Sequence, residues 1–112
     1  MNKQQKINTA RQHLQLAYNS RDGVVKLNKN NTLQHELAKF LLCWEALQTE
    51  KTFVSEAIFS NGKRADIFIL DDCEAWEVLH SESRAEFEKK DYPVAKRAFD
   101  AETIIDKWRY KI

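Results

Sequence analysis

Residues 52–80 hold three short apolar segments separated by turn signals, and this arrangement constrains the fold more than any other feature. The segments are TFVSEAIFS (52–60), RADIFIL (64–70) and EAWEVLH (74–80). Each is rich in β-branched and aromatic residues, which favours a strand. Asn61-Gly62 separates the first two, and this dipeptide is the strongest local signal for a hairpin. Asp71-Asp72 ends the second segment. We therefore expect three consecutive strands in one sheet.

Two helices are expected before these strands. Residues 3–20 place apolar side chains at helical spacing. These side chains are Ile7, Ala10, Leu14, Ala17 and Tyr18. A second, stronger helix is expected at about 33–49, with Thr32 or Asn31 as its N-cap. Its apolar positions step by four and three residues, which predicts a wide buried stripe. The stripe consists of Leu33, Leu37, Phe40, Leu41, Trp44 and Leu47.

Three further elements are expected after the strands. They are a polar helix at about 81–91, a strand at 94–99 and a terminal helix capped by Asp100. The resulting order is ααβββαβα, and a central mixed sheet of about four strands flanked by helices is its natural packing. The chain of 112 residues is long enough for one core only. We expect a single α/β domain, with a basic helix and connector at 1–30 and the core at 31–112.

Charge is distributed unevenly along this chain of net charge +1. Residues 1–39 carry seven Lys or Arg against two acidic residues, a net +5, and the remainder carries a net −4. A basic amino-terminal segment is compatible with phosphate contacts. The residues expected to contact DNA are Lys3, Lys6, Arg11, Lys63 and Arg64. A solvated helix with excess lysine explains the same charge equally well.

The cysteines and the hydropathy indicate a compartment. Cys43 and Cys73 are widely spaced, so a reducing cytosol is the default expectation. No apolar stretch approaches the roughly 18 residues of a membrane span, and the polar amino terminus argues against a signal peptide. We therefore expect a cytoplasmic protein without a membrane partner, and we expect Cys43 to be a small core residue.

Three acidic residues fall inside the expected strands. Alternation along a strand places Asp66 on the face of Phe68 and Glu56 on the face of Val54, while Glu77 lies on the third strand. A carboxylate among apolar neighbours either raises its pKa or finds a cation. If the second and third strands are neighbours, Asp66 and Glu77 can share Mg²⁺ or Mn²⁺, which prefer oxygen ligands. The alternative is that these acids are solvated at strand ends or paired with basic residues.

The order of the acidic residues resembles that of the PD-(D/E)XK superfamily of restriction-endonuclease-like nucleases. The similar features are a helix beginning with His35-Glu36, a strand with Glu56, GKRAD with Asp66 and AWEVLHSES with Glu77. The resemblance is greatest to small members such as archaeal Holliday-junction resolvases and compact nuclease-like proteins of viruses and mobile elements. It implies that Asp66 and Glu77 bind Mg²⁺ or Mn²⁺, with Glu36 or Glu56 completing the ligand set.

The resemblance spans roughly residues 33–100 and has one clear departure. The superfamily carries a lysine two residues after the glutamate, where this chain has Leu79. The possible substitutes are Lys63, Lys89 and Lys90, and those on the following helix, Lys89 and Lys90, are the better candidates. The resemblance implies an endonuclease that hydrolyses DNA phosphodiester bonds and acts as a homodimer. Two alternatives stay open, a catalytically degenerate nuclease fold that binds DNA or protein, and a structural protein with buried salt bridges.

Other chemically active side chains are assigned to the surface or the core. We expect His35 on the helix surface, His80 on the strand face opposite Glu77, and Tyr92 as a packing residue at a helix end. Most large aromatic residues fall at core spacing. The expected core aromatics are Trp44, Trp76, Phe53, Phe59, Phe68 and Phe87.

Overall fold

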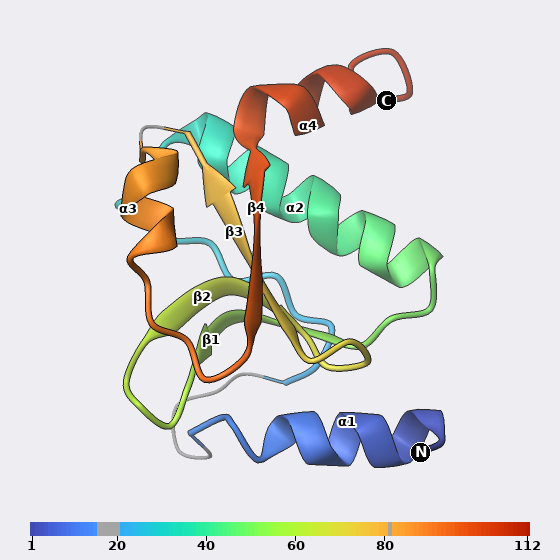
Figure 1. Cartoon of the computed structure of the whole chain (residues 1–112). Coiled ribbons are helices and arrows are strands. Elements are labelled where there is room, and N and C mark those ends of the chain that lie inside the picture. The colour runs from blue at the N-terminus through green and yellow to red at the C-terminus, as the bar shows by residue number, and fades with distance from the viewer. Residues whose placement is uncertain (16–20, 81) are drawn as a thin grey trace.

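The computed structural model describes residues 1–15, 21–80 and 82–112, and it confirms the expected α/β fold (Figure 1). The elements are α1 (Lys3–Arg11), α2 (Leu33–Gln48), β1 (Phe53–Ile58), β2 (Arg64–Ile69), β3 (Glu74–Leu79), α3 (Arg84–Glu88), β4 (Ala95–Asp100) and α4 (Ala101–Trp108). Their order is the expected one. The first helix ends at Arg11 rather than near residue 20, and the expected core positions Ala17 and Tyr18 lie outside the described residues.

A four-stranded mixed sheet lies at the centre, in the order β1-β2-β3-β4. The first three strands pair antiparallel, and the β1–β2 turn contains Gly62 at a φ of 85°, a conformation that glycine adopts without strain. β4 pairs parallel with β3, so the chain must cross over between them, and α3 lies in that crossover. The outer edge of β1 is covered because Gln15 and Gly23 donate backbone hydrogen bonds to it.

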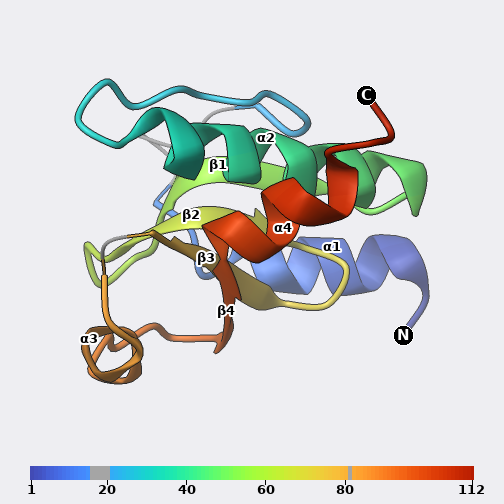
Figure 2. The ribbon, with the colours of Figure 1, turned by 90° about the horizontal axis from the view of Figure 1, so that it is seen from above.

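Helices cover both faces of the sheet and enclose two hydrophobic clusters (Figures 1 and 2). The first cluster lies between the sheet and helices α2 and α4, and includes Phe53, Ile67, Ile69 and Trp76. The second lies on the opposite face under α1, and includes Val54, Phe59, Ala65, Phe68 and Leu70. Cys43 belongs to the first cluster as expected, and burial raises the pKa of its thiol to about 12.

The expected buried stripe of α2 is mostly wrong. Only Leu41 of that stripe is buried, and the remaining members are exposed. Their exposed fractions are 78% for Leu33, 36% for Leu37, 48% for Phe40, 44% for Trp44 and 48% for Leu47. The residues that face the sheet are Ala38, Leu41, Leu42, Cys43 and Ala46. The apolar periodicity predicted the wrong buried face because α2 carries two apolar faces. The face that includes Ala38, Cys43 and Ala46 is the one that packs on the sheet.

The expected alternation breaks at one position in the β1–β2 pair. Ala65 and Phe68 both lie in the cluster under α1, so strict alternation fails between them. Asp66 instead faces α2, on the same side as Ile67. Its counterpart on β1 is Glu56, which has a φ of 49° and also faces α2. The predictions that Asp66 shares a face with Phe68 and that Glu56 shares a face with Val54 are therefore wrong, because both acids face α2 while Phe68 and Val54 lie under α1. At Glu56 the left-handed backbone conformation accounts for the change of side.

No helix in the described ranges combines the length and the apolar character that a membrane span requires.

The second cluster gives a test of the fold. Phe68 is fully buried, and its ring packs edge-on against Phe59 at 5.1 Å between centroids. Phe68→Ala should lower the free energy of unfolding by about 3–5 kcal/mol, measured by urea denaturation. Tyr110→Ala is the control, because Tyr110 is 93% exposed and should change stability by less than about 0.5 kcal/mol. Similar effects for both variants would contradict the described core.

Candidate active site

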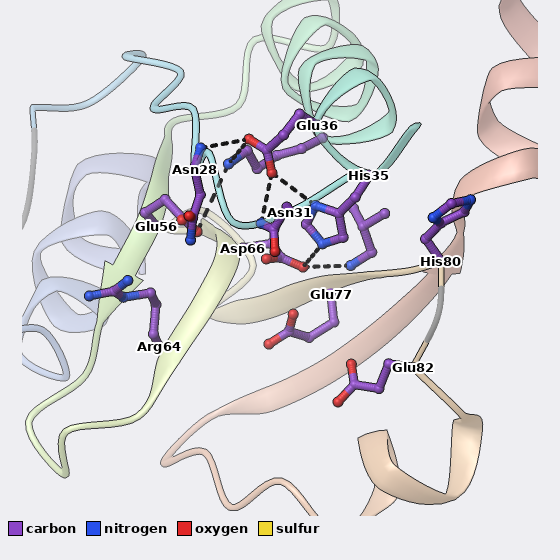
Figure 3. A network of polar contacts seen from close by, with 12 residues as sticks. Asn28, Asn31, His35, Glu36, Glu56, Arg64, Asp66, Glu77, His80 and Glu82 are labelled. Atoms are coloured by element: carbon purple, nitrogen blue, oxygen red, sulfur yellow. Dashed lines mark hydrogen bonds and ion pairs between the residues drawn. The ribbon is translucent and has the colours of Figure 1, made fainter. Parts of the chain in front are cut away.

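The site forms where β2 and β3 separate. Their antiparallel pairing ends at Ile67 and Trp76, and the next opposed pair in the same register would be Asp66 and Glu77. The Asp66 carboxylate replaces the missing ladder contact, because its Oδ2 accepts a hydrogen bond of 2.8 Å from the backbone N–H of Val78. Two carboxyl groups are thereby brought to the gap between neighbouring strands (Figure 3).

The carboxyl groups of Asp66 and Glu77 line the same pocket and influence each other's pKa. Burial raises the pKa of Glu77, and the neighbouring Asp66 raises it further. Burial acts on Asp66 in the same direction, but hydrogen bonds from His35, Glu77 and the Val78 N–H outweigh it and lower the pKa of Asp66. The two pKa values therefore shift in opposite directions, and Glu77 is the member of the pair that is protonated more readily.

Lys90 and Tyr92 approach Glu77 from the segment after α3. The ammonium of Lys90 lies 3.6 Å from Glu77 Oε1 and 3.0 Å from Glu82 Oε1, and these two acids raise the pKa of Lys90 against the effect of burial. The Tyr92 hydroxyl contacts the Glu77 carboxyl group and lies 3.0 Å from the Arg64 carbonyl oxygen. Lys90 is therefore a cation at neutral pH, placed against the carboxyl pair.

The end of α3 is held in place by a residue of β4. The ammonium of Lys96 donates hydrogen bonds to the carbonyl oxygens of Phe87, Glu88 and Lys90, at 2.9, 2.8 and 2.8 Å. A cation at this position satisfies the carbonyl groups that a helix leaves unpaired at its C-terminus. Lys96 therefore positions the backbone from which the Lys90 side chain reaches Glu77.

His35 links the carboxyl pair to α2. Its Nε2 lies 3.3 Å from Asp66 Oδ2, and its Nδ1 lies 3.0 Å from Glu36 Oε1. Burial lowers the pKa of His35, but the two carboxylates more than offset this and raise it above the ordinary value. His35 lies in the first turn of α2. The Thr32 hydroxyl caps this helix by accepting a hydrogen bond from the His35 N–H. The imidazole is thus oriented by two acids, and it orients Asp66 in turn.

A completely buried lysine lies behind His35. The Lys39 ammonium has no exposed surface and lies 2.6 Å from Glu36 Oε2 and 3.9 Å from Glu56 Oε2. Glu36 also accepts hydrogen bonds from Asn31 Nδ2 and the Asn28 N–H, and these contacts lower its pKa against the effect of burial. The pKa of Glu56 is raised by burial, although Lys39 opposes this. Acids and bases therefore alternate along one network from Glu56 to Asp66.

Two hollows lie on either side of this network. The first, of about 180 Å³, is lined by polar residues around the carboxyl pair. They are Asn31, His35, Asp66, Glu77, Val78, His80, Glu82 and Lys90. The second is a wider groove of about 510 Å³. It is lined by Lys26, Leu27, Asn28, Lys29, Asn30, Glu56, Ile58 and Arg64. The carboxyl pair thus faces a small polar pocket, and a groove with three basic residues lies beyond Glu56.

Some of the expected site residues come together and others do not. Asp66, Glu77 and Lys90 line one pocket. Lys89 follows α3 as an exposed residue that does not line the pocket. Glu36 connects to Asp66 only through His35, and Glu56 lines the other groove. Glu36 and Glu56 are therefore held by Lys39 instead of adding carboxylates to the Asp66–Glu77 pair.

The expected DNA contacts are scattered. Lys3 pairs with Asp71 and reaches the Glu50 carbonyl oxygen beyond the C-terminal end of α2, whereas the carboxyl pair lies near the helix N-terminus. The 16 residues of α2 span roughly 24 Å. Arg11 is paired with Asp22. The other expected contacts, Lys6 on α1 and Lys63 in the β1–β2 turn, are exposed, and Arg64 lines the basic groove.

Three site residues were missed by reasoning from sequence. His35 was expected on the surface, but 13% of its side chain is exposed and it contacts Asp66 and Glu36. Tyr92 was expected only to pack, and Lys39 was not singled out. The adjacency of His35 and Glu36 was a usable signal, because both lie at the start of the helix that approaches the strands. His80 bonds the Thr32 hydroxyl at 2.8 Å and lines the same pocket as Glu77.

The carboxyl pair is suited to a hard divalent cation. Asp66 and Glu77 supply oxygen atoms from two elements, and two neighbouring carboxylates repel each other, so a cation beside them is favoured. Within the described part of the chain, no group of three or more His, Cys, Asp and Glu side chains is arranged to hold a metal ion. A two-carboxylate site still fits Mg²⁺ or Mn²⁺, because these ions retain several waters and bind through one or two carboxylates.

Comparison with known proteins returns no relative. No protein-family model matches the chain, no curated protein matches it, and no solved structure matches it.

The buried lysine can be tested through its pH dependence. Lys39→Met leaves Glu36 and Glu56 without their cation and should lower the free energy of unfolding by about 3–5 kcal/mol at pH 7. The lowered pKa of Glu36 stabilises the fold above the ordinary carboxyl pKa, and this contribution is lost as the pH falls through the folded value. The loss caused by Lys39→Met should therefore shrink at pH 4, measured by urea denaturation. Adding Glu36→Gln to Lys39→Met should recover part of the lost unfolding free energy at pH 7. An equal loss at pH 7 and pH 4 would contradict the ionic role of Lys39.

The carboxyl pair should oppose folding at neutral pH. Because the pKa of Glu77 is raised, its protonated form stabilises the fold fully below the ordinary value, and this is lost as the pH rises through the folded pKa. Glu77→Gln mimics the protonated form and should stabilise the metal-free chain by about 1–3 kcal/mol at pH 8, with a smaller effect at pH 5. Thermal unfolding in EDTA measures this. Glu88→Gln, at an exposed position of α3, is the control. A Glu77→Gln variant that is less stable than the parent at pH 8 would contradict the raised pKa of Glu77.

Proposed function

We propose that the chain is a metal-dependent deoxyribonuclease that hydrolyses phosphodiester bonds in the pocket around Asp66 and Glu77. The observation that carries this proposal is one pocket that joins a buried carboxyl pair from two neighbouring strands to the ammonium of Lys90. The arrangement supports the resemblance to the PD-(D/E)XK superfamily, in which strand-borne acids and a lysine meet. The free thiols of Cys43 and Cys73 suit the reducing cytosol as the compartment.

Each residue has a role that follows from its contacts. Asp66 and Glu77 would hold Mg²⁺ or Mn²⁺ through their carboxylate oxygen atoms. When bound, such an ion polarises a phosphate oxygen and lowers the pKa of water. Lys90 remains protonated beside Glu77 and Glu82, so it would stabilise negative charge on the phosphate and would not act as the base. His35 would keep Asp66 oriented toward the pocket.

The basic groove beyond Glu56 is the proposed path of the DNA backbone. Lys26, Lys29 and Arg64 line it, and it lies on the side of the network opposite the carboxyl pocket. Cations along a groove bind phosphates without regard to base sequence and make affinity salt-dependent. The groove is a better candidate than α1, since Lys3 and Arg11 of that helix are already paired with acids.

A second candidate function is a binding module on a degenerate nuclease fold. It is favoured by Leu79, which occupies the position of the superfamily lysine and is only 9% exposed. It is also favoured by the ionic contacts that hold Glu36 and Glu56 to Lys39. In this case the groove would bind DNA, and the carboxyl pair would have no catalytic role.

Cleavage of supercoiled and branched DNA with Mn²⁺, Mg²⁺ or EDTA tests the first proposal. Asp66→Asn and Glu77→Gln should abolish cleavage, and the expected stability of Glu77→Gln separates lost chemistry from lost folding. Lys90→Met should lower the rate at least about 100-fold, as the loss of one charge-stabilising donor does. Lys89→Met is the matched control and should cleave at the parent rate, because its side chain lies outside the pocket.

The outcomes separate the two functions. Cleavage that persists in EDTA or in Glu77→Gln would refute the metal-dependent mechanism. Binding without cleavage, weakened by Lys26→Gln and Arg64→Gln and unchanged by Lys3→Gln, would establish the binding module. Absence of both cleavage and binding would refute both functions.

A further inference from the structure

The outer face of α2 carries an apolar stripe that the described residues of the chain cover only in part. We define the α2 stripe by its five members, which are Leu33, Leu37, Phe40, Trp44 and Leu47. Their exposed fractions range from 36% for Leu37 to 78% for Leu33. The spacing of four, three, four and three residues is that of the core positions of a two-helix coiled coil. Such spacing is typical of a helix that packs along another helix.

The stripe is separate from the face that α2 buries in its own fold. The sheet side of α2 carries small residues such as Ala38, Cys43 and Ala46, which let the helix lie close to the strands. The exposed side carries two aromatic residues and three leucines instead. A hollow of about 390 Å³ lies along it, lined by Leu37, Phe40, Leu41, Trp44, Trp108, Lys111 and Ile112. Both aromatic side chains of α2 thus lie on its outer face, beside an apolar hollow.

The α2 stripe is nearly symmetric about its own centre. Phe40 is the third of five members, Leu33 and Leu47 are each seven residues away, and Leu37 and Trp44 are three residues before it and four after it. If a second α2 lies antiparallel, Phe40 meets its own copy, Leu37 meets Trp44, and Leu33 meets Leu47. A surface that complements itself in this way is what a two-fold interface requires, because the same patch is used by both subunits.

The size of the stripe is sufficient for a specific dimer. Taking about 200 Å² as the whole surface of a large apolar side chain, the five members expose roughly 500 Å². That is as large as the largest patch on a typical monomer. Two copies facing each other would remove roughly 1,000 Å² in total, the lower limit for a specific interface, before flanking residues such as Ile112 are counted.

Charge does not oppose this pairing. The helix positions beside the stripe carry the uncharged residues Gln34 and Gln48. Of the acids on α2, Glu36 is buried toward Lys39, and Glu45 is bound by Lys107 at 2.7 Å and by the Trp108 indole N–H at 2.8 Å. Antiparallel packing therefore brings no like charges together along the seam.

We infer that the α2 stripe binds the α2 stripe of a second copy of this chain, antiparallel and centred on Phe40. The inference depends on exposure and spacing, so it stands whether or not the carboxyl pair is catalytic. Each α2 also carries His35 and Glu36 at its N-terminal end. An antiparallel pair would place the two carboxyl pockets at opposite ends of a shared helical seam.

Cysteine crosslinking tests the geometry. In a Cys73→Ser background, which removes the partly exposed native thiol, Phe40→Cys should form a disulfide-linked dimer under mild oxidation. Leu33→Cys alone should not, because its two copies would lie roughly 20 Å apart along the seam. A mixture of Leu33→Cys and Leu47→Cys chains should crosslink. Linkage of Leu33→Cys to itself, without linkage at Phe40→Cys, would show a different interface and overturn the proposal.

Mass measurement tests the association itself. Light scattering of the parent chain should give twice the 13.2 kDa chain mass. Trp44→Glu should weaken the dimer by roughly thirtyfold or more, the effect of losing a buried hot-spot tryptophan. Leu27→Glu is the control, because Leu27 is 75% exposed outside the stripe, and it should stay dimeric. A parent chain that is monomeric at all concentrations, or a Trp44→Glu variant as dimeric as the parent, would overturn the proposal.

Discussion

The hydrogen bond from the Val78 amide to the Asp66 carboxylate is the contact on which the site depends. A sheet whose strands separate exposes backbone groups that must find other partners, and here an acidic side chain supplies one of them. The same exchange places Asp66 and Glu77 in the lining of one small polar pocket, where β2 and β3 separate. The Asp66 carboxylate therefore has two roles, because it accepts the Val78 N–H and also lines the pocket.

The ionic network around this contact shows why a small domain can keep so many acids inside. Five acids lie along one path, and the basic residues His35, Lys39 and Lys90 alternate with them except at the carboxyl pair. At that pair two acids are neighbours with no base between them, and burial together with Asp66 raises the pKa of Glu77. The other acids of the network are each next to a basic residue. An added cation would therefore be stabilised most at the Asp66–Glu77 pair.

Sequence reasoning reached the order of elements and the Asp66–Glu77 pair, because turn residues and β-branched runs mark strands locally and consecutive strands pair. Prediction from sequence failed where the same pattern was compatible with two different structures. The periodicity of α2 could not say which of two apolar faces meets the sheet. The reversal at Glu56 could not be foreseen, since its positive φ occurs without glycine. Lys39 was overlooked because a helical lysine is normally solvated, and only the converging acids Glu36 and Glu56 make its burial tolerable.

The contacts of Lys96 with the end of α3 have a consequence for motion. β4 is an edge strand with alternately exposed residues, and edge elements open more readily than the centre of a sheet. Because Lys96 fixes the carbonyl groups at the end of α3, fraying of β4 releases the backbone that carries Lys90. The pocket therefore joins acids on the two central strands to a cation whose backbone is tied to an edge strand, so opening of β4 would displace Lys90 before Asp66 or Glu77.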